Sequence, residues 1–133
     1  MKNINKVLDI LEETYPDAKC ELDYTTPFEL LVATILSAQC TDVRVNKVTG
    51  EMFKKYNTPM DFAKLSIDEI QEEIKTCGLY KSKAEKIKST SEKICNEYNG
   101  EVPDNLEDLT KLPGVGRKTA NVVLSNAFGQ DAM

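Results

Sequence analysis

The residues LPGVGRKTANVVL, at positions 112–124, form the most informative segment of this sequence. Its first half has the proline and the two closely spaced glycines of a tight turn. Apolar residues at helical spacing follow, at Ala120, Val123 and Ala127. A helix is therefore expected to begin directly after Gly116. Such a helix directs unpaired backbone N–H groups and the positive end of its dipole outward, an arrangement that binds phosphate.

Two cations, Arg117 and Lys118, occupy the first turn of this expected helix. Positive charge at that position repels the helix dipole. Helix stability therefore does not account for the two cations, whereas an anionic partner does. Many helices that bind nothing also begin after a glycine turn, so the turn alone is a weak signal. The whole pattern of proline, two glycines, two cations and an apolar helix is far more specific.

This pattern resembles the helix-hairpin-helix motif of DNA-repair glycosylases, and residues 112–124 closely resemble the endonuclease III family of bifunctional glycosylase/lyases. The resemblance implies an all-α helical barrel with the motif at about residues 106–128. It implies double-stranded DNA with a damaged base or an abasic site as the partner. It also implies removal of oxidised pyrimidines and strand cleavage by β-elimination through a lysine Schiff base.

Composition limits the class of protein. With 133 residues the chain is one domain, or one domain and part of another, and 41% hydrophobic residues suffice for a core. A charged fraction of 29%, with no apolar run near the roughly 20 residues that a spanning helix needs, argues against a membrane protein. No secretory signal is visible, so a cytoplasmic location is expected, at the nucleoid if the source is a bacterium.

The net charge of −5 argues at first against a nucleic-acid partner. Residues 79–93, however, contain five lysines and two glutamates, so positive charge is concentrated there. Interactions with phosphate are short-ranged at physiological salt, and a locally basic face on an acidic protein can still bind DNA.

Helical spacing, N-terminal caps and glycine or proline breakers divide the chain into helices joined by short loops. The expected helices cover residues 3–15, 27–38, 41–56, 58–63, 66–76, 82–98, 106–110 and 117–128. No segment has the pattern of a strand, so the fold class is expected to be all-α. The helix over residues 27–38 is apolar nearly all round, which predicts a central, buried position.

Some of the helix ends carry specific signals. Thr26 can cap the helix after it, and Glu29 is placed to complete a capping box with it. Ser66 and Glu69 form a second capping box at the start of another helix. Gly78 suits the left-handed position that commonly ends a helix.

Lys118 is the candidate nucleophile. An uncharged lysine amine can attack a sugar carbon and form a Schiff base. The positive helix end, the neighbouring Arg117 and desolvation under bound DNA all favour the uncharged amine. Residue chemistry alone favours a simple phosphate contact for Lys118. The resemblance implies the catalytic role, because the family's catalytic lysine stands two positions after the second hairpin glycine, Gly116.

The resemblance also implies residues that enter the duplex when a base is flipped out. Gln39, between two expected helices, matches a position that plugs the vacated stack, and Leu79 matches one that wedges beside the orphaned base. Without the resemblance, Gln39 is a loop glutamine and Leu79 a hydrophobic contact at a helix end. The other expected DNA contacts lie in the hairpin and in a second lysine-containing turn: Pro113, Gly114, Val115, Gly116, Arg117, Thr119, Lys81 and Lys83.

The resemblance implies two further features, a metal cluster and a catalytic carboxylate, that are not expected within these 133 residues. The family carries a 4Fe-4S cluster on four cysteines and a catalytic aspartate, and both lie C-terminal to the hairpin. The chain ends before any such segment, and Asp131 lacks the right context to be assigned the role. No Cys-x-x-Cys pair and no histidine is present, so reduced thiols and no metal are expected at the four cysteines: Cys20, Cys40, Cys77 and Cys95.

The resemblance covers nearly the whole chain but about two-thirds of a typical family member. We therefore expect an incomplete piece that is inactive or nearly so, from an intact protein that is a monomer. Residues 21–133 would form the helical barrel, and residues 1–20 a helix whose partner is the family's other lobe. An unpartnered helix would expose its apolar stripe or bury it by self-association through residues 3–15: Ile4, Val7, Leu8 and Leu11.

Other classes of protein remain possible at this point. Hairpin motifs of this kind also serve as sequence-independent phosphate grips in proteins without this chemistry. The combination of Gln39, Leu79 and Lys118 favours the enzyme, because a plain grip requires none of the three. A helical bundle with no nucleic-acid partner is the third reading.

Overall fold

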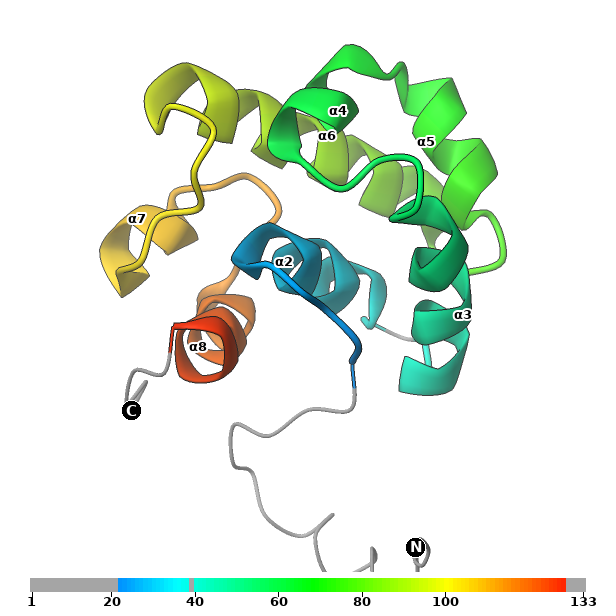
Figure 1. Ribbon diagram of the computed structural model, residues 1–133, viewed down its shortest axis with the longest axis horizontal. Coiled ribbons are helices and arrows are strands. Elements are labelled where there is room, and N and C mark those ends of the chain that lie inside the picture. Colours follow the sequence, from blue (N-terminus) through cyan, green and yellow to red (C-terminus); the bar gives the residue numbers. More distant parts are fainter. Residues whose placement is uncertain (1–21, 39, 129–133) are drawn as a thin grey trace, which may run out of the picture.

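The computed structural model describes residues 22–38 and 40–128, and Figure 1 shows their arrangement. These residues form helices and contain no strand, which confirms the expected all-α fold. The predicted helix over residues 3–15 lies outside the described residues, as do Gln39 and residues 129–133. No helix within the described ranges is both long enough and apolar enough to cross a membrane.

The central helix is α2 (Pro27–Leu36), as its apolar sequence predicts. Eight of its ten residues are buried. It packs against α3 (Asp42–Met52), α6 (Tyr80–Glu97) and α8 (Arg117–Ala127). Figure 1 places α2 in the middle of the molecule, with α6 on one side and α8 on the other. The hairpin motif and the long helix α6 are therefore held on a common core.

Glu29 is buried at the start of α2, but it does not complete the predicted capping box. The Oγ1 atom of Thr26 accepts the N–H of Glu29 at 3.1 Å, as expected of a cap. The Glu29 carboxylate instead accepts from the N–H of Thr25 at 2.7 Å and from its hydroxyl at 2.8 Å. Its other oxygen accepts from Nδ2 of Asn57 at 3.3 Å. A buried carboxylate needs several donors, and Glu29 finds them one residue before the cap and on a distant loop.

The end of α3 differs from the sequence-based prediction. The helix stops at Met52, four residues before the predicted end at Tyr56. The N–H of Lys55 donates to the carbonyl of Met52 at 3.0 Å, a spacing of three residues that tightens the chain as it leaves the helix. This turn lets the Tyr56 ring pack edge-on against the buried Phe62, with the centroids 6.2 Å apart.

The helices α4 (Pro59–Lys64) and α5 (Ile67–Ile74) pack against α6. The predicted capping box of α5 is confirmed. The Ser66 hydroxyl accepts the N–H of Glu69 at 3.1 Å, and the Glu69 carboxylate accepts the N–H of Ser66 at 2.8 Å. The helix α5 ends two residues earlier than predicted, which gives the chain room to turn into α6.

The turn into α6 contains an unusual backbone conformation. The helix begins at Tyr80, two residues earlier than predicted, and Leu79 before it has φ 57° and ψ 37°. Gly78 does not have a positive φ, so the prediction that this glycine takes the left-handed position is wrong. That conformation costs a residue with a side chain about 1–2 kcal/mol. Leu79 is therefore held in place against its own backbone preference.

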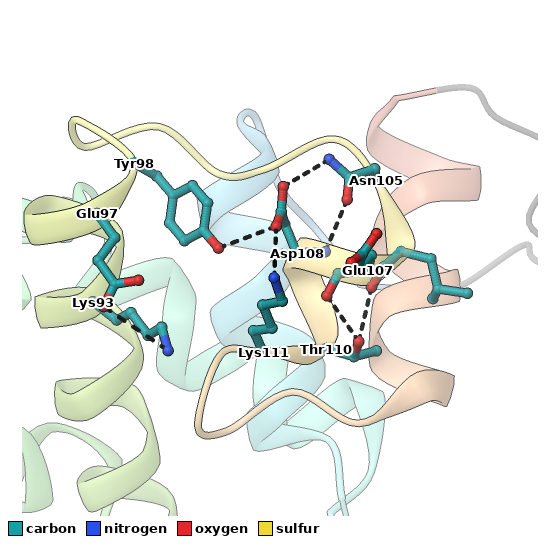
Figure 2. Close-up of polar contacts among 9 residues, drawn as sticks. Lys93, Glu97, Tyr98, Asn105, Glu107, Asp108, Thr110 and Lys111 are labelled. Atoms are coloured by element: carbon teal, nitrogen blue, oxygen red, sulfur yellow. Dashed lines mark hydrogen bonds and ion pairs between the residues drawn. The ribbon is translucent and has the colours of Figure 1, made fainter.

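The first helix of the hairpin motif, α7 (Leu106–Thr110), is linked to the end of α6 by a polar contact (Figure 2). The Asp108 carboxylate accepts from the Tyr98 hydroxyl at 3.4 Å and lies 3.7 Å from Nζ of Lys111. Desolvation and the neighbouring carboxylate raise the pKa of Tyr98, which keeps its hydroxyl protonated as a donor. Asn105 caps α7 by accepting the N–H of Asp108 at 2.8 Å. One hydrogen bond, from Tyr98 to Asp108, thus links α7 to the end of α6, and the other contacts of Asp108 lie within α7 and its caps.

Candidate nucleic-acid interface

Gly114 brings the hairpin turn directly against α6. Its N–H donates to Oγ1 of Thr90 at 3.0 Å. A Cβ at Gly114 would lie 2.8 Å from Cβ of Lys86, closer than real Cβ atoms approach, and 3.1 Å from Oγ1 of Thr90, which is also tight. Its φ lies outside the left-handed region. Glycine is required here because two backbones approach closely, and not because the turn needs a positive φ.

Two backbone N–H groups of the turn have acceptors within the protein, whereas those that follow have none among the described residues. Gly114 donates to Thr90, and the N–H of Val115 donates to the carbonyl of Leu112 at 3.0 Å. No described residue accepts from the N–H groups of residues 116–119, and α8 has no side-chain cap. The first turn of α8 therefore offers unsatisfied donors at the positive end of the helix dipole, as a phosphate site requires.

Exposed cations lie on both helices that meet at this turn. Arg117 and Lys118 are exposed in the first turn of α8, and Lys81 and Lys86 are exposed on α6. Within residues 22–38 and 40–128, none of the four forms an ion pair. Four exposed cations thus lie on the two helices at the hairpin, with the exposed Glu85 between Lys81 and Lys86 on α6, although the chain carries a net charge of −5.

Leu79 stands at the start of α6, seven residues before Lys86, which corresponds to about 10 Å along the helix axis. Its side chain is 58% exposed. An exposed apolar side chain on a strained backbone contributes little to the core. Residues held in such conformations cluster at functional sites. The geometry of Leu79 is thus consistent with the wedge position that the sequence resemblance implies.

Lys83 does not have the surface position expected of a phosphate contact. Its side chain is 2% exposed, and Nζ donates to the carbonyl of Leu36 at 2.8 Å, at the carboxyl end of α2. Burial lowers the pKa of Lys83. The ammonium group is turned into the protein, so we remove Lys83 from the candidate DNA contacts.

The remaining predicted positions divide by exposure. Pro113 is exposed and Thr119 is half-buried, so both lie where a ligand on the turn could reach them. Val115 is buried in the core, and only its backbone faces the turn. Gln39 lies outside the described residues.

The chain that carries the hairpin and these exposed residues matches a known protein family. Residues 32–128 match the HhH-GPD superfamily base excision DNA repair proteins. The chain belongs to this superfamily. Its all-α fold, with α7 and α8 as the two helices of the hairpin motif, agrees with that assignment.

Within the HhH-GPD superfamily, the chain is similar to endonuclease III. It is 50% identical to endonuclease III of Bacillus subtilis (strain 168) over 133 residues, which are 100% of this chain and 61% of that protein. The chain thus spans about three-fifths of the length of this relative.

Two solved structures are similar to the chain as well. One is a non-covalent endonuclease III–DNA complex and the other a trapped endonuclease III–DNA covalent intermediate, the estranged-adenine complex. Each has a TM-score of 0.82 and 51% identity, and each match covers 96% of this chain and 60% of the solved chain.

The described cysteines do not fit an iron–sulfur cluster. Cys40 and Cys77 interact with each other, while Cys95 lies in the last turn of α6, roughly 20 Å along that helix from its first residue. Burial, with Cys40 beside it, raises the pKa of the Cys77 thiol to about 11, so this sulfur stays protonated. No group of three or more metal-binding side chains occurs among the described residues.

Thr90 contacts the candidate site but was not predicted from the sequence. It stands on the buried face of α6 between Ile87 and Ile94, where an apolar residue would be expected. A polar residue in an apolar stripe indicates a buried hydrogen-bond partner, and here that partner is the hairpin. The same signal was present at Lys83, which lies seven residues earlier on the same face.

Proposed function

We propose that the intact protein, of whatever length its gene encodes, is a DNA N-glycosylase for oxidised pyrimidines that also cleaves the strand at the resulting abasic site. Its partner is double-stranded DNA that contains a damaged base or an abasic site. Membership of a base excision repair superfamily supports the general class. The substrate would place the protein in the cytoplasm, at the nucleoid in a bacterium.

The observation that carries this proposal is the first turn of α8. Unsatisfied N–H groups of residues 116–119 and the exposed Arg117 suit a phosphate group. Lys118 is exposed in the same turn, so an amine stands beside the anchored backbone of the strand. A phosphate grip that holds one nucleotide next to a nucleophile is the arrangement that attack on a sugar carbon requires.

In the proposed reaction, the uncharged amine of Lys118 attacks C1′ of the damaged nucleotide. The bond from C1′ to the base breaks, and the base leaves with the electron pair and takes up a proton. The attached nitrogen then loses one proton and the bond from C1′ to O4′ breaks, with O4′ taking up a proton. The lysine and the opened sugar are now joined by a protonated Schiff base. Loss of a proton from C2′ expels the 3′ phosphate by β-elimination, and water releases the lysine.

Leu79 would act on the duplex rather than on the sugar. Flipping a base out of the stack costs free energy of unstacking, and an apolar side chain that fills the vacated space can offset part of that cost. Lys81 and Lys86, exposed on the same helix, would contact nearby phosphates. Residues 1–133 alone are expected to be inactive or nearly so, and the activity is proposed for the intact protein.

Borohydride trapping tests this function. The intact protein is incubated with duplex DNA carrying one abasic site, in the presence of borohydride, which reduces a Schiff base to a stable bond. A covalent protein–DNA adduct is expected with the abasic duplex and not with an undamaged control of the same sequence. Absence of the adduct, together with DNA binding that weakens with salt, would favour a non-catalytic phosphate grip instead. Absence of DNA binding at any salt concentration would exclude both functions.

Substitutions at Leu79 separate its side chain from its backbone. In Leu79→Gly the left-handed strain disappears, so the free energy of unfolding is expected to stay level or rise by up to about 1 kcal/mol. Trapping on the abasic duplex is nevertheless expected to slow, because the wedge is lost. Leu79→Ala keeps the strain and loses the wedge, so it should slow trapping equally with no gain in stability. Thermal unfolding and trapping rates measure both effects, and an unchanged trapping rate in both variants would remove Leu79 from the site.

A further inference from the structure

The buried ammonium of Lys83 joins two elements that meet beside the candidate site. Its Nζ donates to the carbonyl of Leu36, the last residue of α2, at 2.8 Å. Its backbone N–H donates to the carbonyl of Leu79 at 3.0 Å. One residue therefore connects the carboxyl end of the central helix with the strained, exposed leucine.

The surroundings of Lys83 make this connection rigid. The last carbonyls of a helix have no partner within the helix, and a cation satisfies them and interacts favourably with the helix dipole. The side chain is 2% exposed, so water does not compete for the hydrogen bond. Burying a lysine costs free energy that an apolar residue would not cost. If the position only filled space in the core, a leucine or methionine would be buried at a lower cost in free energy.

We propose that Lys83 is a positioning residue for Leu79. Its hydrogen bond to the end of α2 fixes the first turn of α6. This first turn holds Leu79 in its exposed, left-handed conformation. The inference rests on the proposed function, because the role of Leu79 is insertion into a DNA duplex.

The chain provides a matched control in Lys88. This lysine lies on the same helix, and its Nζ donates to the carbonyls of Ala63 and Leu65 at 2.7 and 2.6 Å, at the end of α4. It makes the same kind of contact as Lys83 but holds a helix end that carries no candidate DNA residue. Lys88 is only half-buried, and its Nζ also lies 3.3 Å from the Glu92 carboxylate. Lys83→Met and Lys88→Met therefore both remove a lysine that binds carbonyls at a helix end, and only the first is expected to disturb Leu79.

The test compares borohydride trapping by the intact protein on duplex and on single-stranded DNA with the same abasic site. A single strand has no orphaned base and no gap to fill, so its trapping does not depend on Leu79. We expect Lys83→Met to lower the duplex rate about tenfold relative to the single-strand rate, a change of about 1.4 kcal/mol. Lys88→Met is expected to leave this ratio unchanged, although it lowers the thermal stability. Lys83→Leu, which also removes the donor, decides the ratio if Lys83→Met does not fold. Lys83→Gln, which keeps an N–H donor, is expected to lose less of the ratio than either.

A double-mutant cycle shows whether Lys83 acts through Leu79. The ratio for Lys83→Met combined with Leu79→Ala should equal that for Leu79→Ala alone. An equal loss on both DNA substrates, a matching loss in Lys88→Met, or additive losses in the double variant would overturn the inference. An adduct absent from both substrates with the unsubstituted protein would instead overturn the proposed function, and the inference with it.

Discussion

Lys118→Ala in the intact protein is expected to yield no covalent adduct above background on abasic duplex DNA. The side chain is exposed in the first turn of α8 and makes no ion pair with a described residue, so its removal leaves the fold intact. Surface substitutions of this kind change stability by about 0.5 kcal/mol or less. Loss of the adduct would therefore report on the missing amine and not on unfolding.

The neighbouring cation gives the control for this experiment. Arg117→Ala removes one positive charge from the same helix turn but leaves the proposed nucleophile in place. Both variants are expected to bind DNA more weakly. The slope of the logarithm of the binding constant against the logarithm of the salt concentration should fall by about one, the value for one lost phosphate contact. Only Lys118→Ala should lose the adduct. An adduct that persists in Lys118→Ala would show that another amine is the nucleophile.

Gly114→Ala is expected to cost about 1–3 kcal/mol of stability, because the added methyl group overpacks the contact between the hairpin and α6. Its Cβ would lie 2.8 Å from Cβ of Lys86, a backbone-proximal atom that cannot move aside as the tip of a flexible side chain does. The turn must shift, and the N–H groups of residues 116–119 shift with it. DNA binding is expected to weaken about tenfold or more as a result.

Gly116→Ala is the matched variant two residues further on. Gly116 has φ −91°, and a Cβ there would meet no atom within 4 Å. Its stability should stay within about 0.5 kcal/mol of the unsubstituted protein. The methyl group would nevertheless stand beside the free N–H groups, so DNA binding should weaken without any loss of stability. Chemical denaturation and DNA titration on both variants measure this difference, and equal stability of the two would contradict the close packing at Gly114.

The fold could be predicted from local sequence patterns because contacts with distant residues do not override most of them. The apolar sequence of α2 allows only a central position, and the capping box at Ser66 and Glu69 forms as the sequence indicates. The boundaries of α7 are the predicted ones, since Asn105 and the following turn act locally. The all-α fold class followed from these same signals.

The predictions that were wrong depended on contacts outside the local patterns used. Glu29 accepts from Thr25, one residue before the cap, and from the distant Asn57, and neither partner belongs to the capping-box pattern. Leu79 takes the left-handed conformation that glycine normally takes, because the packed start of α6 determines it. Lys83 was expected to contact DNA because it lies in a lysine-containing turn, but it stands on the buried stripe of α6.

The chemistry of the candidate site followed from the sequence only in part. The turn, the free helix end and the cations could be derived from residue types, and the structure has them together. The role of Lys118 could not, because an exposed lysine beside a phosphate site is chemically ordinary. Only the resemblance to a family distinguishes a nucleophile from a contact at that position.

The polar bonds of α6 have a consequence for how this helix can vary. Lys83 and Thr90 are seven residues apart, so they lie on one face of the helix and within about 20° of the same direction. One of them holds the end of α2, and the other holds the hairpin. A single inserted or deleted residue between them would rotate one relative to the other by about 100° and displace it by 1.5 Å. The number of residues between Lys83 and Thr90 is therefore fixed by these two contacts. Single-residue insertions or deletions are compatible with this architecture only outside residues 83–90.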